Sequence, residues 1–134
     1  MREILFRGKR MDNGKWVEGD LAHCNGIRAQ NPIVCIWETD EDGLYNEAWV
    51  DPCTVGQFTG LTDKNGNRIF EGDIVKAMSV PMLVIFDEES AHFFARYYMD
   101  GHKDCFENTL YGHDRLTVIG NIHDNPELME VHNE

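Results

Sequence analysis

The stretch that decides the fold is VDPCTVGQFTGLTDKNGNRIFEGDIVKA, residues 50–77. The Asn-Gly pair at 65–66 favours a two-residue hairpin turn, because both residues tolerate the positive φ that a type I′ turn requires. The Gly-Asp pair at 72–73 marks a second turn, and the β-branched pair at 74–75 is typical of a strand. The stretch therefore predicts short strands that reverse direction at glycine-bearing turns.

The segments before this stretch extend the same pattern. Residues 3–23 alternate apolar and charged side chains around a turn at 12–14, which predicts a hairpin with a kink or bulge at Gly19. Residues 33–37 form a continuous apolar run, short enough for a strand that is buried on both faces. The acid-rich segment 38–47 has no apolar period and predicts an exposed loop.

The second half of the chain predicts further strands, a loop and one short helix. A spacing of about ten residues between strands is typical of small barrels and sandwiches. Residues 99–114 mix turn formers with isolated apolar side chains, and we expect a loop there with at most one short strand or helical turn. Asn125 as N-cap and Pro126 behind it predict a short C-terminal helix. The predicted strands cover residues 74–78, 83–86, 91–98 and 116–122.

Length and composition indicate a soluble protein. The 134 residues, with 42% hydrophobic and 27% charged, predict one domain, with an N-terminal β subregion at 1–50 and a barrel core at 51–130. The longest apolar run, 80–86, is far shorter than the roughly 20 residues of a membrane span. The first residues lack the apolar run of a signal peptide, so we expect the protein in the cytoplasm. In that reducing compartment the four cysteines are expected to be free thiols.

The charge distribution leaves several interpretations open. The formal net charge is −12, which repels nucleic-acid backbones. Residues 1–15 hold five bases against two acids, however, so the basic charge is concentrated at the N-terminus. This segment is a solvated hairpin, or a basic edge that docks an acidic partner or the acidic face of a second copy.

Few residues of the chain are suited to metal binding or catalysis. His102, Cys105 and His113 lie within twelve residues of each other, but the two closely spaced ligand pairs of a structural zinc site are missing. The acids at 40–42 do not follow EF-hand spacing. No serine lies in a Gly-x-Ser-x-Gly elbow, and no phosphate-binding glycine loop precedes a lysine. We therefore expect no metal, no cofactor and no enzymatic activity.

The aromatic segment HFFARYY, residues 92–98, supplies the candidate site. Alternation places His92, Phe94, Arg96 and Tyr98 on one face of a strand. Aromatic rings beside a cation can stack on bases, and the same residue types are enriched in subunit interfaces. The sequence leaves three interpretations of this face open: a base-stacking platform, a protein interface, or ordinary core and surface.

Several motifs along the chain resemble the YopX family of phages and prophages. The Cys at position 53 replaces the acidic residue usual in such sequences. The resemblance implies an all-β protein with an SH3-like barrel, encoded by a mobile element, and it implies no established activity and no catalytic residues. The matching motifs are FRGK at 6–9, VDP at 50–52, TVGQFTGL at 54–61, DKNG at 63–66, FEGDIV at 70–75 and VIGNIHDNPEL at 118–128.

The functional hypothesis follows from both lines of reasoning. We expect a non-enzymatic phage or prophage accessory protein that acts in the host cell through contacts with host or phage proteins, or through self-assembly into a homo-oligomer. The alternative is a small-barrel nucleic-acid-binding protein that uses the aromatic strand at 91–98, although the net charge disfavours it. The specific partner and the oligomeric state do not follow from the sequence.

Overall fold

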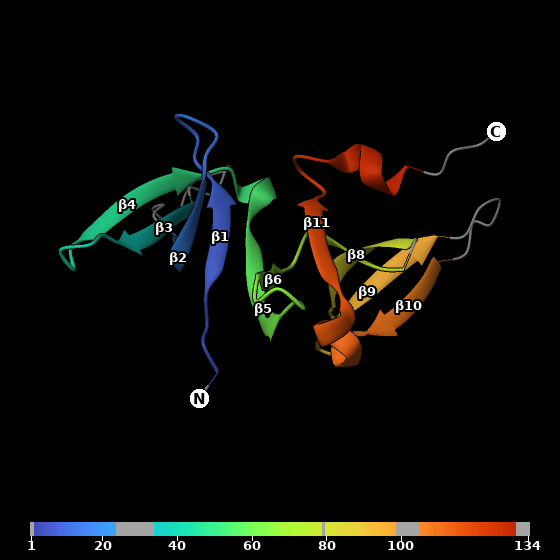
Figure 1. Cartoon of the computed structure of the whole chain (residues 1–134). Coiled ribbons are helices and arrows are strands. Elements are labelled where there is room, and N and C mark those ends of the chain that lie inside the picture. Colours follow the sequence, from blue (N-terminus) through green and yellow to red (C-terminus); the bar gives the residue numbers. More distant parts are fainter. Residues whose placement is uncertain (1, 24–33, 79, 99–104, 131–134) are drawn as a thin grey trace. The chain divides into compact units, whose positions relative to one another are not determined.

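The structure, a computed structural model, describes residues 2–23, 34–78, 80–98 and 105–130, with the side chains at 98, 105–109 and 111 left out (Figure 1). Its elements are short strands and 3-10 helices, and no described helix exceeds six residues. The all-β prediction is confirmed. The strands are β1 (Phe6–Lys9), β2 (Trp16–His23), β3 (Val34–Thr39), β4 (Tyr45–Val50), β5 (Gly56–Thr62), β6 (Arg68–Phe70), β7 (Asp73–Ala77), β8 (Val80–Asp87), β9 (His92–Tyr98), β10 (Cys105–Thr109) and β11 (Thr117–Asn121), and the helices are η1 (Pro52–Thr54), η2 (Leu110–Arg115) and η3 (Pro126–Met129).

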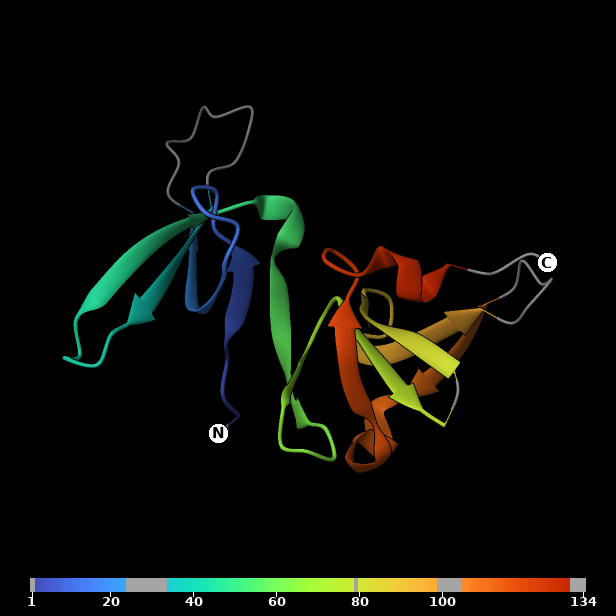
Figure 2. The same ribbon diagram turned by 45° about the horizontal axis from the view of Figure 1, so that its top comes forward.

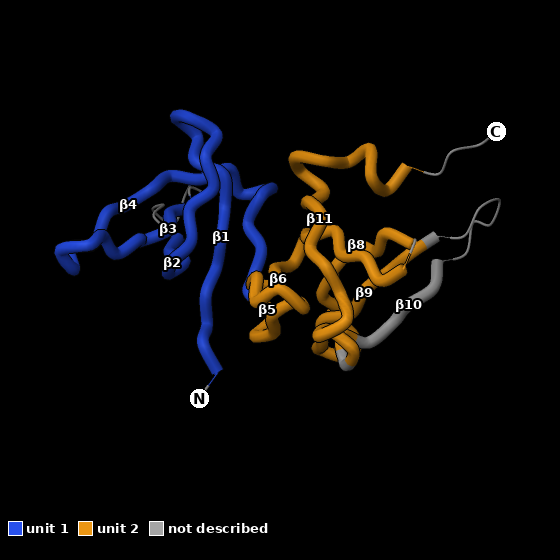
Figure 3. The backbone as a smooth tube through the Cα atoms, in the orientation of Figure 1, with its two compact units in different colours: residues 1–58 blue, residues 59–134 orange. Residues whose placement is uncertain are grey.

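The chain divides into two compact units, residues 1–58 and 59–134 (Figure 3). The sequence predicts one domain whose subregions meet at 50/51, whereas the observed division falls within β5. The described strands form two antiparallel sheets, in the orders β4-β3-β2-β1-β5-β6 and β10-β9-β8-β7-β11. The SH3-like character of the fold stays a prediction.

Unit 1 is built on the predicted N-terminal hairpin. Strands β1 and β2 pair in antiparallel register, and β2, β3 and β4 follow as a meander. One face of this sheet forms a core in which Val17, Ile36 and Val50 are buried. Gly19 is required by a close approach of strands, because a Cβ there would lie 2.1 Å from the carbonyl oxygen of Trp37. The close backbone approach explains the glycine in a strand interior.

The acid-rich segment at 38–47 is a hairpin, and the prediction of an exposed loop over its whole length is wrong. Strands β3 and β4 pair from Val34 to Thr39, and only the connection between them is irregular (Figure 2, teal to green). The Asp40 carboxylate accepts hydrogen bonds from the backbone N–H of Asp42 and of Leu44 and from the amide of Asn46. These bonds lower the pKa of Asp40 despite some desolvation. Asp40 therefore stabilises the turn between β3 and β4.

Unit 2 has buried side chains on both faces of its five-stranded sheet. On one face Val75, Val84 and Ala95 form the centre of a core. On the opposite face Ile74 and Phe94 are buried as well. Helix η3 contacts β8. A short C-terminal helix is thus confirmed as a 3-10 helix, but Asn125 does not cap it through its side chain.

Asp63 organises the turn at the centre of the fold-deciding stretch. Its carboxylate is 4% exposed and accepts hydrogen bonds from Asn65 N, Asn67 N, Asn67 Nδ2 and Val118 N. Burial raises the pKa of Asp63, and these four bonds together bring it below its usual value. The predicted type I′ turn is wrong, since only Gly66 of the pair has positive φ. The three-residue loop ending in this glycine instead suits a type I turn with a G1 bulge.

Two other expectations need correction or completion. The segment 99–114 contains strand β10, paired with β9, and most of η2, which is more regular structure than the sequence predicts. Cys53 is a free, exposed thiol, but Cys35 is disulfide-bonded. The expectation of free thiols is therefore wrong for Cys35. Within the described part of the chain, no helix has the length and apolar composition to cross a membrane.

Candidate interaction surface

The three tryptophans of the chain lie on one face of the unit 1 sheet, opposite the core. Trp16 and Asp20 share a face of β2, and Asp20 pairs with Trp37 across the next strand. Trp37 in turn pairs with Glu47, which shares a face of β4 with Tyr45 and Trp49. We call Trp16, Trp37, Tyr45 and Trp49 the tryptophan face. Side chains on the same face of neighbouring strands contact each other, so these rings form one surface.

Two of the four rings of the tryptophan face are open to solvent, and Trp16 and Trp37 are partly buried. Tyr45 is 62% exposed and Trp49 is 53% exposed, and both lie on β4, the edge strand of the sheet. The Trp37 and Tyr45 rings meet edge to face, with centroids 6.5 Å apart and an interplanar angle of 73°. Together with Asp20 they line an open groove of about 310 Å³. Large exposed aromatic side chains clustered in this way mark binding surfaces.

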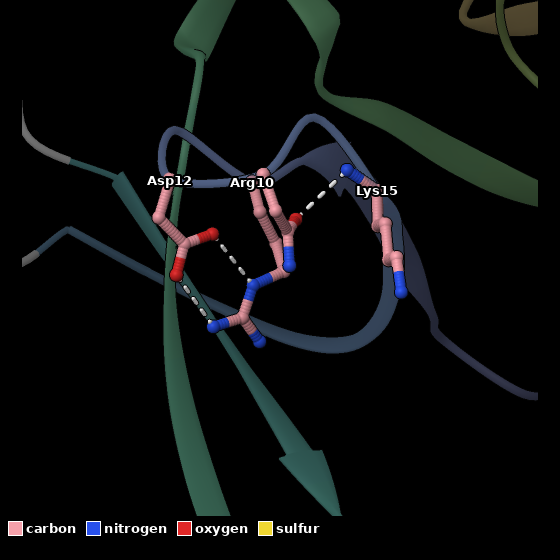
Figure 4. A network of polar contacts seen from close by, with 4 residues as sticks. Arg10, Asp12 and Lys15 are labelled. Carbon is pink, nitrogen blue, oxygen red and sulfur yellow. Dashed lines mark hydrogen bonds and ion pairs between the residues drawn. The ribbon is translucent and has the colours of Figure 1, made fainter.

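On the tryptophan face, β1 carries the cations Arg7 and Lys9, whereas β2 carries the acids Glu18 and Asp20. The Arg7 guanidinium carbon lies 4.8 Å from the centroid of Trp16, and the Lys9 ammonium lies 5.8 Å from it. At the tip of the same hairpin Arg10 donates two hydrogen bonds to the Asp12 carboxylate, at 3.0 and 2.9 Å (Figure 4). This ion pair raises the pKa of Arg10 and lowers that of Asp12. The predicted basic N-terminal segment is therefore partly neutralised at Arg10, while Arg7 and Lys9 stack on an indole ring.

The end of the tryptophan face at β3 and β4 is acidic. Within unit 1, residues 34–58 contain six acids and no Lys, Arg or His. One of these acids, Glu47, lies among the rings and accepts a 2.7 Å hydrogen bond from the indole N–H of Trp49. The described cations of this face thus lie on β1, and its described acids lie on β2 and β4.

The residues that the sequence singles out lie in unit 2. Phe94 is 2% exposed and is a core residue, which corrects its assignment as a stacking or interface residue. His92 and Arg96 lie beside its ring, at 5.6 Å and 5.4 Å, and are at least partly exposed. The side chain of Tyr98 lies outside the described residues. Phe94 shares a buried face of the sheet with Ile74, and alternation along one strand cannot reveal that this face is covered.

A serine, a histidine and an aspartate also meet at the turn between β8 and β9. The Ser90 hydroxyl donates to the Asp87 carboxylate and lies beside His92 Nδ1. In a catalytic triad the histidine lies between the other two groups, whereas here the serine does. The Ser90 hydrogen bond lowers the pKa of Asp87, as a turn-closing contact would. Among the described residues no three His, Cys, Asp or Glu side chains gather into a metal-binding group. His102 and the Cys105 side chain lie outside the described residues.

Sequence reasoning missed the tryptophan face. Its signal is the alternation of Tyr45, Glu47 and Trp49, which has the period of a strand. The acids at 38–47 obscured this signal, because they suggested a loop that extends over the first half of β4. Trp37 was assigned to a strand buried on both faces, whereas it is half-exposed.

Comparison with known proteins agrees with this architecture. A crystal structure of protein EF1440 from Enterococcus faecalis matches with a TM-score of 0.55 and 24% sequence identity, over 97% of this chain and 100% of that chain. A 65-residue segment is 34% identical to hydroxyquinol 1,2-dioxygenase of Corynebacterium glutamicum, which is 48% of this chain and 22% of the dioxygenase. The chain thus spans about a fifth of the length of this curated relative. The model of the YopX family, described as YopX protein, matches residues 5–130. The chain belongs to the YopX family.

Proposed function

We propose that this protein is a non-enzymatic accessory protein of a phage or prophage that acts by binding another protein through its tryptophan face. The observation that carries the proposal is the gathering of all three tryptophans and Tyr45 on the sheet face opposite the core. Tryptophan and tyrosine dominate binding energy at protein interfaces, because they bury much apolar area with little loss of side-chain entropy.

The position of the surface on an edge strand supports this proposal. An edge strand has unpaired backbone N–H and C=O groups that can receive a strand of a partner. At the end of β4 the Trp49 carbonyl accepts a hydrogen bond from Met11 N–H, and Val50 forms a bridge with Arg10. The first part of the strand, with the exposed side chain of Tyr45, is the part of this edge that a partner strand can pair with. Self-assembly through the same face is a second form of this function, because the face carries cations on β1 and acids on β2 and β4.

The nucleic-acid alternative receives less support. Phe94, the central ring of the segment at 91–98, is buried and offers no face for stacking on a base. The net charge of −12 opposes a nucleic-acid backbone.

Site-specific photocrosslinking in the bacterial host tests the proposal. Benzoylphenylalanine replaces Tyr45 in one variant and Phe86 in a control variant, since Phe86 is an exposed aromatic residue of unit 2 that is outside the tryptophan face. We expect a protein adduct from position 45 that is lost when Trp49→Ala is added, and no comparable adduct from position 86. An adduct of twice the chain mass identifies self-assembly.

Two results would overturn the proposal. One is the absence of any protein adduct from position 45 under conditions where the position-45 variant and the control variant are both folded. The other is tight binding of labelled single-stranded DNA at low salt, where electrostatic attraction to a backbone is strongest. The phage or prophage origin is tested separately by the genes that neighbour this one.

A further inference from the structure

We propose that the groove lined by Asp20, Trp37 and Tyr45 is a cation-binding site that accepts an arginine or lysine side chain from a basic segment of the partner protein. This inference rests on the proposed function and names the chemistry of the partner. It concerns the groove within unit 1 alone.

The groove combines the two elements that recognise an organic cation. Trp37 and Tyr45 meet edge to face at 73°, so the corner between them presents a ring face next to a ring edge. Cations within about 6 Å of a ring centroid are attracted by the negative face of the ring, most strongly for tryptophan. Asp20 lies opposite Trp37 across the β2–β3 pair and is one of the three residues that line the groove, so it is the acidic residue next to a cation held there. The volume of about 310 Å³ suffices for a guanidinium group and its stem.

The polar groups of this groove are uncommitted. Within the described part of the chain no hydrogen bond or ion pair engages the Asp20 carboxylate, and no acceptor faces the Trp37 indole N–H. A guanidinium has five N–H donors in a planar fork, which suits a carboxylate beside an aromatic face. The indole N–H can donate to a backbone carbonyl of the same segment. A cationic peptide therefore satisfies groups that water satisfies in the free protein.

The same sheet face already shows this mode of recognition within the chain. Arg7 and Lys9 of β1 stack on Trp16, while no described cation stacks on Trp37. Trp37 is the equivalent ring toward β4, where residues 34–58 of unit 1 carry six acids and no base. Charge complementarity thus favours a basic occupant, since a field of one sign raises the association rate of the opposite charge.

The test uses the full chain and two peptides that differ in one charge. One peptide carries a single arginine between glycines, and the other carries citrulline, the neutral isostere of arginine, at the same position. The readout is the indole N–H signals in a proton–nitrogen NMR spectrum, which three Trp→Phe variants assign. We expect the arginine peptide to shift the Trp37 signal while the Trp49 signal stays in place, and the citrulline peptide to bind at least tenfold more weakly, equal to about 1.4 kcal/mol.

Matched variants separate the groove from general acidity. Asp20→Asn removes the wall carboxylate and is expected to weaken binding of the arginine peptide about tenfold. Asp42→Asn causes the same change in net charge at an exposed position outside the groove, and it should leave the affinity within about twofold. Indole spectra of the free variants confirm that each retains the fold.

Several outcomes would overturn the inference. Equal binding of the two peptides, equal effects of the Asp20 and Asp42 variants, or a Trp37 signal that never moves would each do so. A Trp37 shift that depends on protein concentration without peptide would assign the groove to a second copy of this chain. If Tyr45 crosslinks a protein but the arginine peptide leaves Trp37 unchanged, the interaction surface stands and only the cation site fails. If the arginine peptide shifts the Trp37 signal but Tyr45 crosslinks no protein, the cation site stands and the proposed protein interaction fails.

Discussion

The two units both contain strands with aromatic residues, but they differ in whether those side chains are buried or exposed. The unit 1 sheet buries one face and leaves aromatic rings exposed on the other, while the unit 2 sheet buries side chains on both faces. Strand β9 of unit 2 is the more aromatic in sequence, yet its central ring, Phe94, is buried. Strand β4 of unit 1 has only two aromatic residues, and both are exposed. Cover over a sheet face therefore decides whether an aromatic residue stabilises the fold or is available for binding.

The physical basis of the difference lies in what contacts each sheet. Helix η3 contacts β8 in unit 2, and its Leu128 approaches Gly120 so closely that a Cβ there would lie 3.1 Å from the Leu128 Cδ1 atom. In unit 1 the tryptophan face has an open groove rather than a packed layer at Trp37 and Tyr45. Four substitutions test this contrast, in order of decreasing effect on stability.

Phe94→Ala should have the largest effect. Removal of a fully buried phenylalanine loses its transfer free energy and leaves a cavity, so we expect the free energy of unfolding to fall by about 3–5 kcal/mol. Chemical denaturation measures this loss. Phe86→Ala is the matched control, because Phe86 is 39% exposed and should cost about 1 kcal/mol. Similar small losses for both variants would mean that Phe94 is not core, and the contrast between the units would disappear.

Asp63→Asn should rank second, with a loss of about 1.5–3 kcal/mol, typical of hydrogen bonds to a charged acceptor. Asp63 Oδ2 accepts from both Val118 N and Asn67 Nδ2, and an amide nitrogen in its place would oppose two donors. The hydrogen bond from Val118 N to Asp63 holds β11 at the point where its register with β7 shifts, between Val118 and Gly120. An unchanged denaturation midpoint would show that the turn at 63–67 does not need this carboxylate.

The pH dependence sharpens the same test. The folded chain lowers the pKa of Asp63, so its carboxylate contributes stability that is fully present above the unfolded pKa of 3.8. This contribution is lost as the pH falls through the lower, folded pKa. We expect the wild-type chain to lose more stability than Asp63→Asn between about pH 5 and pH 2. Parallel curves for the two proteins would assign the acid sensitivity to other carboxylates.

Gly19→Ala tests the backbone approach within unit 1. The added Cβ would meet the Trp37 carbonyl oxygen at 2.1 Å, so β2 or β3 must shift, at a cost of about 1–3 kcal/mol. Gly112→Ala is the control, since its Cβ would enter open space and its φ is −90°. Thermal denaturation compares the two variants. The shift should also change the groove at Trp37, so a destabilised variant with unaltered Trp37 signals would argue against this geometry.

Trp49→Leu should have the smallest effect on stability, within about 0.5 kcal/mol, because the side chain is half-exposed on an edge strand. Its effect on binding should instead be large, as for other central aromatic residues of interfaces. Denaturation and the crosslinking yield from position 45 measure the two quantities. A stability loss as large as that of Phe94→Ala would show that the tryptophan face is covered like the sheet of unit 2.

Much of the fold could be predicted from local sequence, and the candidate site could not. The hairpin over residues 3–23 and most strands of unit 2 follow from alternation and turn residues, because these act between near neighbours in the chain. The turn at 63–67 departs from its prediction because Asp63 binds Val118, 55 residues away. The sequence predicts a binding role for Phe94 for a similar reason, since the burial of its face of the sheet is not set by its local sequence.

The sequence by itself determined an all-β chain and its glycine-bearing turns, because both depend on short-range patterns. It also determined membership of the YopX family, because the family is recognised by the order of its motifs. Only the tertiary structure decided which aromatic residues are exposed. Alternation assigns side chains to two faces of a strand but does not tell which face another segment covers. That cover comes from distant parts of the chain, and it separates buried Phe94 from exposed Tyr45 and Trp49.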